Sequence, residues 1–66
     1  MKPKRKHEMY SIGDKGTYCY PNGNQKAEIT AIEEETFGTV VYLETETGNK
    51  ESFIVYGDDE LRWKFE

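Results

Sequence analysis

The fold is decided by residues 39–56, which read TVVYLETETGNKESFIVY. Two runs of strand-forming residues flank Glu46-Thr47-Gly48-Asn49, a cluster of turn formers. Gly48 can adopt the left-handed conformation that closes a three-residue hairpin loop, in which a type I turn is followed by a bulge. This turn sets the register and places four large side chains on one face. We predict that these four form the core: Val41, Leu43, Phe53 and Val55.

The opposite face of this hairpin would carry a stripe of four large side chains: Val40, Tyr42, Ile54 and Tyr56. Monomeric proteins seldom leave such a contiguous apolar stripe bare, so we take it as the candidate partner-binding surface. Two alternatives remain open. The stripe could pack beneath the N-terminal or C-terminal segment, and a register slip of one residue would exchange the two faces.

Two more strands are predicted before this hairpin. Residues 15–20 suit a pleated surface and end at the turn formers of residues 21–24. Residues 27–31 alternate between apolar and polar side chains, and Ile32 breaks the alternation, which suggests a bulge. The three adjacent glutamates at residues 33–35 favour a solvated connection, with Phe37 tucked beneath it.

The C-terminal residues predict a helical turn and a last strand. Residues 58–62 begin with three carboxylates, which are favourable at the positive end of a helix. Residues 63–65 would then form a short strand. The predicted fold class is therefore all-β: a small five-stranded SH3-like barrel with a short helical turn before the last strand.

Length and composition are consistent with one small domain. Sixty-six residues can enclose a single core. We divide the chain into a flexible basic arm, residues 1–9, and the barrel, residues 10–66. Cys19 is the only cysteine, so no internal disulfide is possible, and the basic N-terminus lacks the apolar stretch of a signal peptide. A soluble, cytoplasmic protein is expected.

The order of elements resembles the SH3-like barrels of the Tudor and KOW type over residues 10–65. Within that group, Ile12-Gly13-Asp14-Lys15, then Tyr20-Pro21-Asn22-Gly23, then Ile29 with Ala31-Ile32-Glu33-Glu34, are similar to the RNA polymerase-interacting domain of CarD-type transcription regulators. The family usually has an aliphatic residue where Gly16 stands and a glycine-rich segment where this chain has Asn24-Gln25-Lys26. The resemblance implies a protein-binding role, with RNA polymerase as the partner.

Charge is distributed unevenly along the chain. The arm has four cationic side chains, whereas all thirteen carboxylates lie in residues 8–66. Nucleic acid would therefore be bound weakly, by the arm, and the acidic body would suit a basic protein. The candidate nucleic-acid-binding residues are Lys2, Lys4, Arg5 and Lys6.

No convergent catalytic set is visible, so we expect a protein that is not an enzyme and that needs no cofactor or metal. His7 and Cys19 lack credible partners, and the carboxylates show no metal-ligand spacing. Aromatic residues could instead cage a methylated cation, with Asp58 or Glu60 contributing charge. The cage candidates are Tyr18, Tyr20 and Trp63, with Tyr10 and Tyr56 beside them.

We predict a non-catalytic protein-binding module that uses the stripe, and a partner strand could also add to an open sheet edge. Two alternatives are kept. One is a nucleic-acid-associated protein that holds phosphate through its arm. The other is a small acidic inhibitor, of phage type, whose carboxylates imitate nucleic acid.

Overall fold

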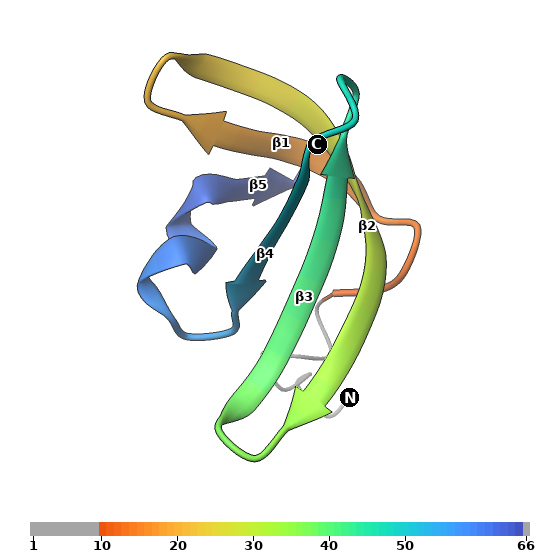
Figure 1. Ribbon diagram of the computed structural model, residues 1–66, viewed down its shortest axis with the longest axis vertical. Coiled ribbons are helices and arrows are strands. Elements are labelled where there is room, and N and C mark those ends of the chain that lie inside the picture. Colours follow the sequence, from red (N-terminus) through yellow and green to blue (C-terminus); the bar gives the residue numbers. More distant parts are fainter. Residues whose placement is uncertain (1–9, 66) are drawn as a thin grey trace, which may run out of the picture.

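The computed structural model describes residues 10–65 of the 66-residue chain. Within that range, five strands and a 3-10 helix follow one another (Figure 1). They are β1 (Lys15–Tyr20), β2 (Gly23–Glu35), β3 (Gly38–Thr45), β4 (Lys50–Ile54), η2 (Asp58–Arg62) and β5 (Trp63–Phe65). The all-β class, the five strands and the helical turn before the last strand are therefore confirmed.

The strands form an antiparallel sheet in the order β4-β3-β2-β1-β5. The long strands β2 and β3 curve through the length of the molecule, and β1 and β5 lie across their upper part (Figure 1). In the described residues β4 and β5 are the two edges and do not pair with each other, so the sheet is not closed. The prediction of a closed barrel is therefore wrong. In place of a strand pair that would close the sheet, η2 packs against β4, β1 and β5.

The β3–β4 hairpin has the predicted turn and register. Gly48 has a φ of 90°, and its N–H donates to the Thr45 carbonyl at 2.9 Å. The Thr45 N–H donates to the Asn49 carbonyl at 2.8 Å, which completes the type I turn with its bulge. Val41 pairs with Phe53, as the predicted register requires.

The core lies on the inner face of the curved sheet. All four predicted core residues of the hairpin are at most 7% exposed. Phe53 is central, because its ring meets Tyr10 edge-on at 5.3 Å and stacks on Trp63 at 6.4 Å. The buried cluster consists of Tyr10, Tyr18, Ala27, Ile29, Val41, Leu43, Phe53, Val55 and Trp63.

The glutamates at residues 33–35 lie in β2, and the predicted solvated connection is wrong. Glu33, Glu34 and Glu35 pair with β3 residues in register. Successive side chains of a strand point to opposite faces, which separates adjacent charges, and Glu34 also accepts a hydrogen bond from the Thr39 hydroxyl at 3.1 Å. The turn that follows contains Phe37, which is 68% exposed and not tucked beneath a loop.

The bulge in β2 occurs two residues before the predicted one. The register shifts between Ile29 and Ala31, so Thr30 is the extra residue. The extra residue reverses the alternation of faces, and Ile32 therefore pairs with Val41 and packs against the core.

Candidate interaction surface

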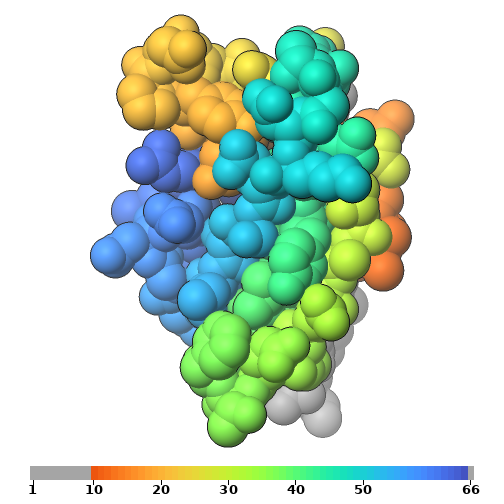
Figure 2. All heavy atoms as spheres, in the orientation of Figure 1, coloured from red at the N-terminus to blue at the C-terminus, as the bar shows by residue number. Residues whose placement is uncertain are grey.

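The predicted stripe is partly preserved on the outer face of β3 and β4. Val40 pairs with Ile54, and Tyr42 pairs with Ser52, so the three stripe residues on these strands share that face. Ile54 is 41% exposed and Tyr42 is half-buried. We call Tyr42 and Ile54 the outer patch. β3 and β4 lie side by side in Figure 2, with the β2–β3 turn projecting at the lower end.

Two members of the stripe are placed differently from the prediction. Val40 is only 7% exposed because it lies in a central strand, between Glu33 of β2 and Ile54 of β4. Tyr56 lies beyond β4, which ends at Ile54 where the Gly57 N–H donates to the Ile54 carbonyl at 2.7 Å. Tyr56 has a φ of 70° and is 79% exposed, so it does not continue the outer face of β4.

Carboxylates border the outer patch. Glu33 pairs with Val40 and Glu35 with Gly38, which places both glutamates on the patch side of β2. Burial raises the pKa of Tyr42, and the charge of Glu33, a hydrogen bond to Glu33 and the charge of Glu35 raise that pKa further. The phenol therefore stays neutral, and the patch has an apolar centre with an acidic rim.

The cage candidates lie together but do not form an open cage. Tyr18 pairs with Trp63 across β1 and β5, and their exposed fractions are 4% and 5%. Both are core residues, because the pairing directs them to the inner face. Tyr20 is half-buried, meets Tyr18 edge-on at 5.1 Å, and donates its hydroxyl to Glu51 at 2.8 Å. Burial and then Glu51 raise the pKa of Tyr20.

Glu60, the carboxylate proposed for the cage, instead holds η2 to the core. Its Oε2 accepts the Tyr10 hydroxyl at 2.6 Å, and its Oε1 accepts the Tyr56 N–H at 3.1 Å. Burial raises the pKa of Tyr10, and the hydrogen bond and charge of Glu60 raise it further. Asp58 lies at the start of η2, beside the edge of β4.

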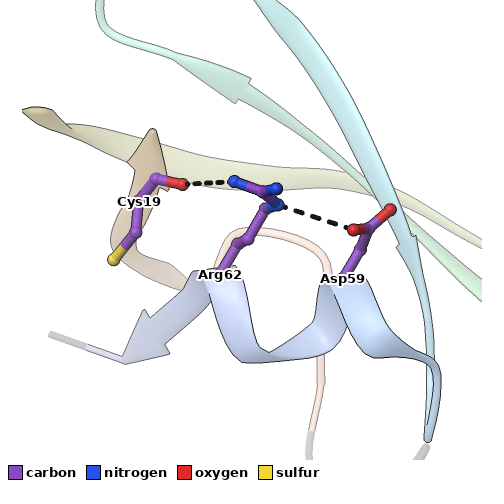
Figure 3. Close-up of polar contacts among 3 residues, drawn as sticks. All are labelled: Cys19, Asp59 and Arg62. Atoms are coloured by element: carbon purple, nitrogen blue, oxygen red, sulfur yellow. Dashed lines mark hydrogen bonds and ion pairs between the residues drawn. The ribbon is translucent and has the colours of Figure 1, made fainter. Parts of the chain in front are cut away.

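A second contact joins η2 to β1 (Figure 3). Arg62 donates from Nη1 to the Cys19 carbonyl at 3.4 Å, and its Nε lies 3.5 Å from Asp59 Oδ1. Both distances are long and both side chains of the ion pair are exposed, so the contribution to stability is small. Cys19 is half-buried, and its sulfur points away from Arg62 (Figure 3).

Two grooves mark the surface of the described residues. The larger, about 400 Å³, lies over β1, β2 and β3 and mixes both charge signs; it is lined by Lys15, Lys26, Ala27, Glu28, Thr30, Glu44, Thr45 and Glu46. The smaller, about 200 Å³, runs between β4 and η2. The sequence predicted neither groove, and the smaller one depends on how η2 packs against the edge of β4.

No group of three or more His, Cys, Asp or Glu side chains within residues 10–65 is placed to hold a metal ion. No helix in this range is long and apolar enough to cross a membrane. The candidate nucleic-acid-binding residues Lys2, Lys4, Arg5 and Lys6 lie outside the described residues.

Comparisons with protein-family models, with curated proteins and with solved structures found no match to this chain.

Proposed function

We propose that this chain is a non-catalytic protein-binding module of the cytoplasm, and that its partner contacts the outer patch. The observation that carries the proposal is the position of Ile54, which is 41% exposed beside half-buried Tyr42 and near Glu33 and Glu35. An aromatic and an aliphatic side chain on rigid strands can anchor a contact, and an acidic rim favours a basic partner surface.

RNA polymerase is the partner that we propose for this surface. The support is the sequence resemblance of residues 12–34 to the polymerase-interacting domain of CarD-type regulators, which are SH3-like modules. The order of five antiparallel strands, with a helical turn before the last, is compatible with that family. The open edge at β4 is compatible with an SH3-like sheet that is incompletely closed.

A binding titration against purified RNA polymerase from the source cell tests both statements. We expect Tyr42→Ser combined with Ile54→Ser to weaken binding by at least about tenfold, because both anchors lose apolar contact area. Ile12→Ser and Leu61→Ser are the matched controls, since these side chains are 68% and 78% exposed and lie outside β3 and β4. Neither control should change the affinity by more than about twofold.

Each alternative function predicts a different experimental result. If the wild type does not bind the polymerase, that partner is wrong. If the patch variant binds as tightly as the wild type, the surface assignment is wrong. Loss of binding after deletion of residues 1–7, with a steep decline at rising salt, would support the nucleic-acid-associated alternative. The phage-type inhibitor would lower polymerase or nuclease activity, and Glu33→Gln with Glu35→Gln would relieve that inhibition.

A further inference from the structure

The outer face of the sheet brings an aromatic ring and two carboxylates together. Glu33 pairs with Val40, which places it on the same face as Tyr42. Glu35 lies two residues further along β2 and shares that face. Burial raises the pKa of Tyr42, and Glu33 and Glu35 raise it further, so both carboxylates act on the phenol. Both glutamates are exposed and therefore accessible to another molecule.

The surface between these carboxylates and β4 is apolar. Val40 lies between Glu33 of β2 and Ile54 of β4. Ile54 is 41% exposed at the far side of this row. Gly38 has no side chain, and a methyl group added there would lie 3.5 Å from Ile54 Cγ2. Position 38 therefore leaves Ile54 uncovered, and a long side chain from another molecule can lie over Val40 and Ile54.

The negative charge at this surface is not neutralised by the described part of the chain. Neither Glu33 nor Glu35 forms an ion pair with a cation of residues 10–65. The ion pair in that range joins Arg62 to Asp59 on η2. Two unpaired carboxylates beside an aromatic ring and an apolar strip are complementary to a cation with an apolar stem.

We propose that the outer patch receives an arginine side chain of the partner protein. The guanidinium would lie over the Tyr42 ring and donate hydrogen bonds to Glu33 and Glu35. Its methylene groups would pack on Val40 and Ile54. A guanidinium is planar, stacks on aromatic faces and has five N–H donors, so one group can make all these contacts. The two glutamates are about 6.8 Å apart along β2, and their side chains can converge on one guanidinium.

Other ligands fit this surface less well. The ammonium group of lysine is a compact and strongly hydrated charge, and it lacks the planar fork that lies on a ring while reaching two carboxylates. A phosphate would be repelled by Glu33 and Glu35. A purely apolar side chain could cover Ile54 but would leave both carboxylates without a counter-charge. Arginine is the side chain that matches the ring, the carboxylates and the apolar strip together.

This inference rests on the proposed function, because it names the chemistry by which a partner would contact the outer patch. Its test needs no partner protein, so the two can fail separately. If an arginine probe binds the patch while RNA polymerase does not bind the protein, the arginine site stands and the partner is wrong. If polymerase binds through the patch while the probe does not, the arginine site is wrong and the proposed function stands.

Amide NMR spectra of the full chain test the inference, with acetyl-Gly-Arg-Gly-amide as the probe. We expect saturable shifts at Val40, Tyr42 and Ile54, with a dissociation constant of about 10 to 100 mM, because one exposed side-chain contact is weak. The corresponding lysine and citrulline peptides, at equal ionic strength, should bind at least about threefold more weakly. Lysine lacks the planar fork, and citrulline lacks the charge.

Two variants of the patch give an independent test. Glu33→Gln with Glu35→Gln should weaken binding of the arginine peptide at least about threefold, and so should Tyr42→Leu, which removes the ring but keeps an apolar side chain. Asp58→Asn with Asp59→Asn is the matched control, since it removes the same charge from exposed residues of η2 and should leave the dissociation constant unchanged. The amide spectra also report whether each variant is folded.

Several results would overturn the proposal. They are shifts centred away from the outer patch, equal binding of the lysine peptide, and folded patch variants that bind the arginine peptide as tightly as the wild type. Deletion of residues 1–7 is the last comparison. If it shifts the patch signals without any probe, the chain's own basic residues fill the site, and the assignment to a partner's arginine is wrong.

Discussion

The indole ring of Trp63 lies against the backbone of Gly16, on the strand beside it. A methyl group added at Gly16 would come within 2.7 Å of Cζ2 and 2.8 Å of Cη2 of Trp63, and would also overlap the Lys64 carbonyl oxygen. Trp63 is 5% exposed and pairs with Tyr18. The absence of a side chain at Gly16 is therefore what lets β5 bring its tryptophan into the core.

Gly16→Ala should destabilise the fold by about 1–3 kcal/mol, because the added methyl overpacks a rigid site bounded partly by backbone. Urea unfolding followed by Trp63 fluorescence measures the change. Ser52→Ala, at an exposed strand position, is the control and should change the free energy of unfolding by less than about 0.5 kcal/mol.

The same clash makes the two sites energetically coupled. Trp63→Phe removes the ring atoms that the methyl group of Gly16→Ala would contact. Gly16→Ala should therefore lower the free energy of unfolding less in the Trp63→Phe background than in the wild type. Circular dichroism replaces fluorescence for these variants. If the two losses in free energy of unfolding simply add in the double-mutant cycle, the contact between position 16 and the Trp63 ring does not limit stability.

The hairpin and its core face were predictable from the sequence because both depend on local patterns. A two-residue period determined which of Val41, Leu43, Phe53 and Val55 share a face, and Gly48 determined the register. Closure of the sheet was not predictable, because it depends on where β4 ends and on how η2 packs between the two edges.

The errors at the candidate sites have a common cause, which is pairing between segments distant in sequence. Three adjacent glutamates look unfavourable in isolation, but pairing with β3 holds them in a strand. Tyr18 and Trp63 look available to a ligand until the β1–β5 pairing directs both into the core. The outer patch was partly predicted: Val40 is buried between two neighbouring strands, and Tyr56 lies in a turn beyond the end of β4.

Tyr10→Phe should cost about 1–2 kcal/mol at neutral pH, because the Tyr10 hydroxyl donates to the Glu60 carboxylate at 2.6 Å and the phenylalanine cannot. The ring contacts with Phe53 and Phe65 would remain. Tyr20→Phe is the matched control, because it removes a hydrogen bond to Glu51 at a more exposed site and should cost less. Equal costs in urea unfolding would refute a special role for the Glu60 contact.

Alkaline pH should destabilise the protein through Tyr10. Burial, and then Glu60, raise its folded-state pKa above the ordinary tyrosine value of 10.0. Between the two pKa values the unfolded chain loses a proton that the folded protein keeps. The stability that Tyr10 contributes is therefore fully present below pH 10. Above pH 10, ionisation of this group lowers the free energy of unfolding by about 1.4 kcal/mol per pH unit. Urea midpoints from pH 8 to 11.5 measure the slope.

Comparison with Tyr10→Phe isolates this contribution, because lysines and the other tyrosines titrate in both proteins. The variant should lose stability less steeply above pH 10 than the wild type. Identical slopes would show that Tyr10 ionises equally easily in the folded and unfolded chains.

The register of the β3–β4 hairpin rests on the left-handed backbone of Gly48, which has a φ of 90°. Gly48→Ala should cost about 1 kcal/mol, since a side chain with a Cβ is strained at that φ although nothing lies within 4 Å of the added methyl. Gly48→Asn should cost less, because asparagine tolerates the left-handed region, and Gly48→Val should cost more. The order Asn, Ala, Val in thermal unfolding would attribute the loss to backbone conformation. The turn determines which face of the sheet Tyr42 and Ile54 occupy. Loss of partner binding should therefore follow the same order, Asn, Ala, Val, only if these substitutions shift the register of the hairpin.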